Sequence, residues 1–329
     1  MSNIYGPVPS WRLGRSLGVD VTAPPKKCTF NCVYCQLGKT KIHVSTPEML
    51  EKPLVGPDKV LADLDDVLKR IDLETVDIVT FSGTGEPTLN LSLGEIAEQV
   101  KARIGMLPMA ILTNSSLFYR EDIRRNLSKF DLVVAKLDAG DDTALKLINR
   151  PADRDLRIST LIDSIKKLRG EIKATLALQV MLLHSENGRV TNVKGEHLKK
   201  LINAIIEVQP DIVQLEVPYR PPSESYVRQP PRRDLREISQ KLSEALGRGR
   251  LWIYGIHDRR RGNVMWLRHR SLEKEVLDLL GRRPCRITDI AFSLGIEISE
   301  ARRILRMLEK KAEVKTRMVN NKEFYFKGG

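Results

Sequence analysis

The stretch Cys28-Thr-Phe-Asn-Cys32-Val-Tyr-Cys35 decides how the rest of the chain is interpreted, because it holds three of the four cysteines. These cysteines follow the spacing C-x3-C-x2-C. Thiolates are soft ligands that bind zinc and iron–sulfur clusters. Three of them on one short loop suit a cubane [4Fe–4S] cluster and leave one iron without a protein ligand. The spacing therefore predicts Cys28, Cys32 and Cys35 as the ligands of such a cluster.

Zinc, a redox pair and chance clustering are the alternatives for this loop. Structural zinc sites normally take four ligands, usually from two separated pairs. The chain has no second cysteine pair, and His43 is the only histidine close to the loop. The cluster is therefore the favoured interpretation.

With Tyr34 directly before the last cysteine, the loop resembles the motif of the radical S-adenosylmethionine (SAM) superfamily. The resemblance implies that the open iron chelates SAM and that an electron from the cluster cleaves SAM to a 5′-deoxyadenosyl radical. It also implies that Tyr34 lies in the cofactor site and that a reductant such as ferredoxin or flavodoxin is a partner. Residues 5–10, 14–20 and 220–224 are similar to a mostly archaeal group distantly related to the tRNA-modifying wyosine-base synthases.

The chain departs from the wyosine-base synthases themselves. Those enzymes are expected to carry a second cluster and a lysine that engages pyruvate. After the motif this chain has only Cys285, which we interpret as a small buried residue, and no lysine identifies itself as a Schiff-base former. Wyosine synthesis is therefore not expected, and the Cys28–Cys35 loop is expected to hold the one cluster.

The composition describes a protein with a large core and a basic surface. The chain has 329 residues, of which 41% are hydrophobic and 29% charged, so one large domain and a small one are expected. It has few cysteines, no signal-like start and no apolar run of about 20 residues, which predicts a cytoplasmic protein with no membrane partner. The net charge of +13 favours an anionic partner, nucleic acid first, over a merely solvated basic surface.

Strand and helix patterns alternate along most of the chain. Six strands are expected at residues 17–21, 76–81, 109–113, 131–137, 172–183 and 212–217, and five helices between them at 58–71, 91–104, 120–127, 156–168 and 194–208. Short strands joined by helices imply an α/β fold with a parallel sheet. The resemblance sharpens this to a partial (β/α)6 TIM-like barrel, in which chemistry takes place at the carboxyl ends of the strands.

The second expected strand ends in Ser82-Gly83-Thr84-Gly85-Glu86-Pro87. The two glycines let the backbone approach a ligand closely, and Glu86 offers a carboxylate to a cation. The stretch resembles the superfamily's GGEP motif, which implies that Gly83, Thr84, Gly85 and Glu86 bind SAM and its methionyl ammonium. The alternative is a glycine-rich turn in which Glu86 supplies a helix-start charge.

Polar residues also follow the later strands. Asn114 is expected near SAM, although it also suits a helix cap, and Gln179 is a weaker candidate for the cofactor site. Alternation places Lys136 and Asp138 on one side of their strand. Such charges on a buried strand are costly unless they are paired or functional, so both are predicted as catalytic, with a mutual ion pair as the alternative.

Three arginines are candidate anion contacts. Arg220 suits a carboxylate or phosphate, or else lies on a surface loop. Arg12 and Arg15 belong to an N-terminal segment that is expected to cover the barrel mouth.

Three domains are expected: a barrel at residues 1–229, a basic connecting extension at 230–267, and a winged-helix-like domain at 268–329. In the extension, Trp252, Tyr254 and Trp266 suit either a nucleic-acid surface or domain packing. The last domain has helix patterns at 272–280, 288–294 and 299–311, with Thr288 as a predicted N-cap, and then a hairpin around Asn320-Asn321. The candidate phosphate contacts are Arg302, Arg303, Arg306, Lys315 and Arg317, although such domains also serve protein contacts or dimerisation.

Together these features predict a radical SAM enzyme that modifies RNA, with tRNA as the first candidate. A protein or a small metabolite is the alternative substrate. An iron–sulfur regulator that binds DNA is the alternative of another class, and the intact Gly83–Pro87 motif argues against it.

Overall fold

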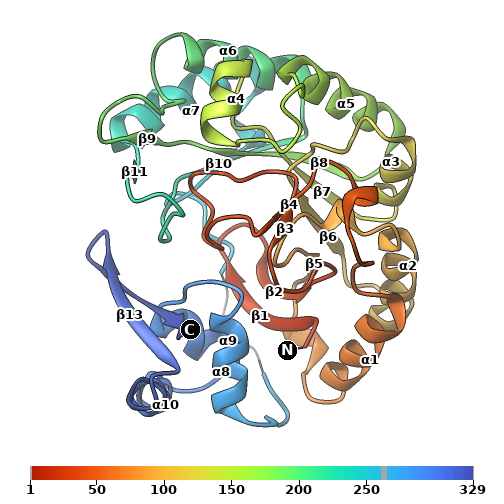
Figure 1. The fold of residues 1–329 in the computed structure, drawn as a ribbon, viewed down its shortest axis with the longest axis vertical. Coiled ribbons are helices and arrows are strands. Elements are labelled where there is room, and N and C mark those ends of the chain that lie inside the picture. Colours follow the sequence, from red (N-terminus) through yellow and green to blue (C-terminus); the bar gives the residue numbers. More distant parts are fainter. Residues whose placement is uncertain (1, 261–264, 329) are drawn as a thin grey trace.

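An eight-stranded sheet organises the chain, of which the computed structural model describes residues 2–260 and 265–328 (Figure 1). Across the sheet the strands are β1 (Ile4–Ser10), β2 (Gly14–Val19), β5 (Ile78–Phe81), β6 (Met109–Thr113), β7 (Leu132–Lys136), β8 (Thr175–Met181), β10 (Ile212–Glu216) and β12 (Leu251–Ile253). β1 pairs antiparallel with β2, and the later pairs are parallel. The sheet curls into a partial barrel with helices on its outside.

The helices connect successive parallel strands and cover the outer face of the sheet. They are α1 (Pro57–Leu68), α2 (Leu93–Ile104), α3 (Glu121–Leu127), α4 (Asp142–Ile148), α5 (Ile158–Glu171), α6 (Gly195–Val208) and α7 (Arg232–Leu246). The sequence did not predict α4, a seven-residue helix whose buried side packs on the cysteine loop. Its first turn is fixed by Asp141, whose side chain accepts a hydrogen bond from the Ala144 N–H at 2.9 Å.

The predicted fold class is confirmed. Each of the six expected strands occupies its expected stretch of the parallel sheet, and β12 adds a seventh parallel strand beside β10. β10, α7 and β12 repeat the β/α pattern, and β12 pairs beside β10 at the end of the sheet. The structure thus links part of the predicted 230–267 segment to the barrel.

The N-terminal segment is part of the sheet, and Tyr5 and residues 8–13 also line the cavity described below. It forms β1 and the start of β2, a hairpin at the edge of the sheet. Arg15, a candidate anion contact, is already paired, since its Nη2 lies 2.9 Å from Asp77 Oδ1. Arg12 points inward, where its Nη1 donates to Gln214 Oε1 at 2.9 Å.

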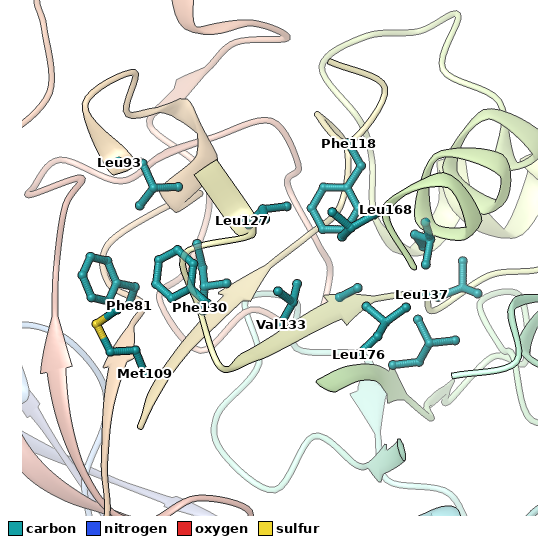
Figure 2. Packing of buried hydrophobic residues seen from close by; sticks show 14 of the residues in the cluster. Phe81, Leu93, Met109, Phe118, Leu127, Phe130, Val133, Leu137, Leu168 and Leu176 are labelled. Atoms are coloured by element: carbon teal, nitrogen blue, oxygen red, sulfur yellow. The ribbon is translucent and has the colours of Figure 1, made fainter. Parts of the chain in front are cut away.

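Alternation along the strands separates the main core from the barrel interior. Phe81 of β5 faces outward and meets Phe130 edge to face, with ring centroids 5.0 Å apart (Figure 2). The preceding residue, Thr80, faces the barrel interior, and its hydroxyl lies 2.7 Å from the hydroxyl of Ser16. The outward face therefore packs as an apolar layer under the helices, whereas the inward face is partly polar.

The C-terminal unit contains the elements that the sequence predicted. These are α8 (Leu272–Leu280), α9 (Ile287–Leu294), α10 (Ile298–Lys310), β13 (Val314–Val319) and β14 (Lys322–Lys327). Asn320 and Asn321 both have positive φ, 49° and 57°, as a two-residue hairpin turn requires. The predicted N-cap Thr288 is wrong: α9 begins at Ile287, and the Asp289 carboxylate accepts the Arg286 N–H at 3.0 Å.

The C-terminal unit has its own apolar core, and this core includes one strand of the barrel sheet. Val276, Ile290 and Ile304 pack together there with Cys285, which is buried as expected. Val8 of β1 belongs to the same cluster. The unit therefore packs against the N-terminal hairpin and lies beside the sheet (Figure 1).

The aromatic residues of the basic extension serve packing. Tyr254 stacks on Tyr219 with ring centroids 4.6 Å apart, and Trp266 Nε1 donates to the Ser293 carbonyl at 2.9 Å. Arg259 lies over the Trp252 ring. Arg261, part of the same basic stretch, lies outside the described residues.

The remaining short elements connect the larger ones. Two-residue strands pair as β3 (Lys27–Cys28) with β4 (Ile42–His43) and as β9 (His184–Ser185) with β11 (Val227–Arg228). The short 3-10 turns are η1 (Pro47–Met49), η2 (Leu73–Thr75), η3 (Pro87–Leu89) and η4 (Arg248–Arg250). Within residues 2–260 and 265–328, each helix is too short or too polar to span a membrane.

Leu64 of α1 tests the contribution of the helix layer. Its side chain is fully buried in the main core, so Leu64→Ala should lower the free energy of unfolding by about 2–5 kcal/mol. Leu91→Ala is the matched control, because Leu91 is 58% exposed and its loss should cost less than about 0.5 kcal/mol. Urea denaturation of the full chain measures both changes. Equal losses in the two variants would contradict the packing described.

Candidate active site

A cavity of about 280 Å³ opens at the carboxyl ends of the parallel strands. Its wall includes Cys35 from the cysteine loop, Gly83 after β5, Lys136 of β7 and Gln179 of β8. The sequence predicted all four as site residues, and the fold brings them to one place. This is where the active sites of β/α barrels lie.

Hydrogen bonds to the end of α4 hold the cysteine loop in position. The Asn31 N–H donates to the Asn149 carbonyl at 3.0 Å, and the Val33 N–H donates to the Ile148 carbonyl at 2.9 Å. All three loop cysteines are free thiols, and Cys28 and Cys32 are buried. The short helix that sequence patterns missed is therefore the support of the predicted cluster loop.

Each thiol has its own donor. Lys26 Nζ lies 3.1 Å from Cys35 Sγ, while Asn114 Nδ2 and Asn149 Nδ2 lie 3.6 Å from the sulfurs of Cys28 and Cys32. Burial alone would lower the pKa of Lys26, but the negative charge of Cys35 raises it overall. The Phe30 N–H also donates to Cys28 Sγ at 3.4 Å, so every cysteine of the loop has at least one donor, as suits a group bound by thiolates.

Burial disfavours ionisation of the Cys28 and Cys32 thiols. Burial raises the pKa of the Cys28 thiol and raises that of Cys32 to about 11. These raised pKa values disfavour free, reactive thiolates at Cys28 and Cys32, whereas coordination to a metal removes the thiol proton outright. The loop therefore fits a metal centre better than a reactive thiol pair.

The arrangement of possible ligand side chains argues against a zinc site. Among the described parts of the chain, no three His, Cys, Asp or Glu side chains are arranged to hold a single metal ion. His43, the remaining candidate ligand near the loop, is exposed. In a [4Fe–4S] cluster each thiolate binds a different iron, so the sulfurs need not converge on one point. The residues present fit the cluster.

Asp138 anchors the aromatic residue of the cysteine loop. Its Oδ2 accepts hydrogen bonds from the Tyr34 hydroxyl and from Asn149 Nδ2, the latter at 2.7 Å, and its Oδ1 accepts the Met181 N–H at 2.8 Å. Burial together with Asp138 raises the pKa of Tyr34. Lys136 Nζ lies 4.0 Å from Asp138 Oδ1 and over the Tyr34 ring. The two residues are neighbours, as alternation predicted, but only Lys136 lines the cavity.

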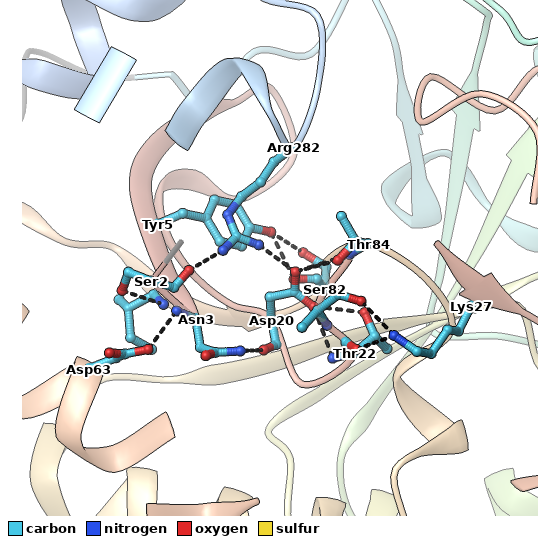
Figure 3. Close-up of polar contacts among 12 residues, drawn as sticks. Ser2, Asn3, Tyr5, Asp20, Thr22, Lys27, Asp63, Ser82, Thr84 and Arg282 are labelled. Atoms are coloured by element: carbon cyan, nitrogen blue, oxygen red, sulfur yellow. Dashed lines mark hydrogen bonds and ion pairs between the residues drawn. The ribbon is translucent and has the colours of Figure 1, made fainter. Parts of the chain in front are cut away.

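The glycine turn is held against Asp20, the residue after β2 (Figure 3). Asp20 Oδ2 accepts the Thr84 N–H at 3.2 Å and the Thr84 hydroxyl at 2.7 Å, and its Oδ1 accepts the Thr22 N–H at 2.9 Å. A Cβ on Gly83 would overlap the Asp20 carboxylate, and one on Gly85 would overlap the Lys27 carbonyl. Both glycines are therefore required by close approach.

Glu86 makes its hydrogen bonds within the protein. Oε1 accepts from the hydroxyls of Thr88 at 2.7 Å and Thr113 at 2.6 Å, and Oε2 accepts the Asn114 N–H at 2.8 Å. Burial raises its pKa although these hydrogen bonds oppose the shift. Glu86 also accepts the Thr88 N–H at the start of η3, the helix-start role that the sequence left open. Gly83 and Gly85 line the cavity, whereas Thr84 and Glu86 lie behind it.

A polar row closes the opposite wall. Gln179 donates to Glu216, whose other oxygen accepts Trp11 Nε1 at 3.2 Å. Burial opposes the ionised form of Glu216, yet the charges of Arg12 and Lys136 hold its pKa below the usual value. The negative charge at this wall is thus matched by two cations.

The C-terminal unit completes the cavity. Arg282, in the loop after α8, pairs with Asp20, donates to the Ser2 carbonyl and lies over the Tyr5 ring (Figure 3). Arg283 lines the cavity beside it. The sequence did not identify Asp20, Arg282 or Arg283 as site residues. An aspartate directly after a strand was the available signal for Asp20; the arginines carried none.

Comparisons with known proteins agree with this site. A family model described as the radical SAM superfamily matches residues 23–189, half of the chain, and these residues contain the cysteine loop and the glycine turn. A UPF0026 protein of Methanocaldococcus jannaschii is 31% identical over 87% of this chain and 84% of its own. A protein of Brachyspira hyodysenteriae named GTPase Obg is 30% identical over 96% of this chain, which spans only 44% of that relative.

Among the solved structures that are similar to this chain is an enzyme that matches over most of its length. Coproporphyrinogen III oxidase from Escherichia coli, described as a radical SAM enzyme, has a TM-score of 0.47 and 11% identity, covering 94% of this chain and 86% of its own. The family match and the archaeal relative decide the assignment. The chain belongs to the radical SAM superfamily, whose enzymes use a [4Fe–4S] cluster and SAM as cofactors.

Proposed function

We propose that this radical SAM enzyme modifies RNA, with tRNA as the first candidate, using a single cluster held by Cys28, Cys32 and Cys35. One observation carries the catalytic part: the cysteine loop and the glycine turn meet at one cavity at the strand ends. When bound, the two cofactors supply the one-electron chemistry that leads to hydrogen-atom abstraction. The protein supplies binding, orientation and exclusion of water.

The residues around the cysteines orient the cluster. Lys26, Asn114 and Asn149 each donate to a different cysteine sulfur, and such donors tune iron–sulfur centres. The Tyr34 hydroxyl donates a hydrogen bond to the Asp138 carboxylate, so Asp138 acts as a positioning residue. Lys136 faces the cavity and is proposed to contact SAM or the substrate directly.

The glycine turn is proposed to bind SAM. Gly83 and Gly85 present open backbone to the cavity, while Thr84 and Glu86 keep the turn rigid through buried hydrogen bonds. Gln179 lines the cavity on the far side and is the weaker candidate contact. In this arrangement Glu86 shapes the turn in addition to offering charge.

A basic face on α10 supports RNA as the substrate. Arg302, Arg303, Arg306 and Lys310 line a groove of about 350 Å³ and are exposed. The exposed side chains of Lys315 and Arg317 lie on the adjacent hairpin. We propose that residues 268–329 form a winged-helix-like domain that contacts phosphates. The similarity of residues 5–10, 14–20 and 220–224 to relatives of tRNA-modifying synthases supports the same proposal.

Radical SAM enzymes generally receive their electron from a carrier such as ferredoxin or flavodoxin, and we propose the same for this chain.

SAM cleavage tests the cluster ligands. With an anaerobic reductant and SAM, the reconstituted protein should form 5′-deoxyadenosine, and Cys32→Ala should abolish this product together with the cluster absorbance. Cys285→Ala is the control, because Cys285 lies in the C-terminal core and should leave both signals intact. A fully loaded wild-type protein that forms no 5′-deoxyadenosine would contradict catalysis and favour a regulator.

Gly85→Ala tests the turn. The new methyl group would overlap the Lys27 carbonyl and displace the turn, which should lower the rate of SAM cleavage by about 100-fold or more. Gly170→Ala is the matched control, since a methyl there meets open space on α5. If Gly85→Ala cleaved SAM at the wild-type rate, the turn would have no part in SAM binding.

The RNA proposal is tested in two ways. Nucleoside mass spectrometry of tRNA from a deletion strain should show a missing modification that the wild-type gene restores. In RNA-binding titrations, the double variant Arg302→Gln/Arg306→Gln should reduce the slope of log K against log salt by about 1.5, because two phosphate contacts are lost. Lys173→Gln, which changes an exposed lysine between α5 and β8, is the control. An unchanged nucleoside profile would leave a protein or metabolite as the substrate.

A further inference from the structure

Arg283 has an unusual setting on the cavity wall. Its Nε and Nη2 are buried, yet neither has a hydrogen-bond partner within residues 2–260 and 265–328. No described carboxylate forms an ion pair with its guanidinium either. A buried charge without a partner is strongly destabilising. The cavity wall therefore holds a half-buried cation that lacks a side-chain hydrogen bond within the described residues, although the charge of Asp289 acts on it.

Three neighbouring arginines are also incompletely paired. Arg220 Nη1 donates to Gln36 Oε1 at 3.0 Å, and Arg12 and Arg282 bond Gln214 and Asp20. The Nε atoms of all three arginines are buried and lack partners in the described part of the chain. These arginines line the same cavity as Arg283.

The charge of the cavity wall is unbalanced. Its cations are Arg12, Lys136, Arg220, Arg282 and Arg283. Glu216 is the one carboxylate among the described lining residues. Two nearby acids are already paired, Asp20 with Arg282 and Asp289 with Arg286. SAM carries a net positive charge and does not restore the balance, so the wall selects a further, anionic ligand.

We propose that Arg220 and Arg283 bind an oxyanion of the substrate, a phosphate or a carboxylate. This rests on the proposed function only in assigning the anion to the substrate. Guanidinium groups bind both oxyanions through paired N–H donors. Arg220 is held ready, since it lies over the Tyr219 ring, which in turn stacks on Tyr254. Its bond to Gln36, next to Cys35, places the anion close to the cysteine loop.

The two arginines come from different parts of the fold. Arg220 follows β10 at the barrel mouth, whereas Arg283 follows α8 in the C-terminal unit. A bound oxyanion therefore bridges the barrel and the C-terminal unit. Binding of such a substrate should also strengthen the contact between them.

Isothermal titration calorimetry on the reconstituted full chain, with SAM present, tests this site. The probes are uridine 5′-monophosphate against uridine, and succinate against its diamide. At least one anion should bind while its neutral counterpart does not, and Arg283→Gln should weaken that binding by about 10- to 100-fold. Arg248→Gln, which changes an exposed arginine of η4, should bind as the wild type does.

Stability separates a binding role from a structural one. The Arg283 side chain makes no hydrogen bond to the described protein, so Arg283→Gln should not lower the unfolding midpoint of the ligand-free chain. Arg283→Lys keeps the charge but loses the paired donors. Its affinity for the anion should lie between those of the wild type and Arg283→Gln. A lowered midpoint in both variants with unchanged binding would make Arg283 structural and overturn the proposal.

The anion that binds in the titration identifies the chemistry of the site. Binding of the nucleotide alone identifies a phosphate, binding of succinate alone identifies a carboxylate, and binding of both supports the shared chemistry. Binding of neither anion, or displacement of the anion by SAM, would overturn the site. Because the titration requires no SAM cleavage, a protein that forms 5′-deoxyadenosine but binds no anion refutes this inference alone. The opposite result refutes the proposed catalysis alone.

Discussion

The buried carboxylate of Asp20 is the contact on which the arrangement of the site depends. It is fully enclosed, and its oxygens accept from Thr22, from the glycine turn at Thr84 and from Arg282 of the C-terminal unit. Burial alone would raise the pKa of Asp20, but Arg282 and these hydrogen bonds lower it overall. One ionised group thereby fixes three segments that are far apart in sequence. Any change that removes its charge disturbs all three together.

The same network explains why the glycines of the turn cannot be replaced. Their backbone lies against Asp20 and Lys27 so closely that a methyl group has no room. Glu86 stands behind the turn and is bonded to the end of β6 through Thr113 and Asn114. Asn114 in turn reaches Cys28, so the turn and the cysteine loop form one hydrogen-bonded unit. A rigid wall of this kind suits a site that must hold two cofactors and a substrate in register.

The sequence predicted the sheet, most helices and the cysteine loop, because these depend on local periodicity and spacing. It also predicted the neighbouring positions of Lys136 and Asp138, since strand alternation sets them. It missed α4, whose buried residues pack on the cysteine loop, and it did not predict β1, because both the packing of α4 and the pairing of β1 with the sheet edge are tertiary contacts. Arg282 and Arg283 were missed because their position depends on how the C-terminal unit packs, through Val8, against the barrel.

That packing has a consequence for the order in which the molecule is made. The cysteine loop and the strands of the barrel leave the ribosome well before the segment that carries Arg282 and Arg283. A nascent barrel therefore has its cysteine loop and an open mouth, with Asp20 still lacking its cation. The wall closes only when the last elements fold against β1. Assembly from the N-terminus thus leaves the cavity wall incomplete until the C-terminal unit has been made.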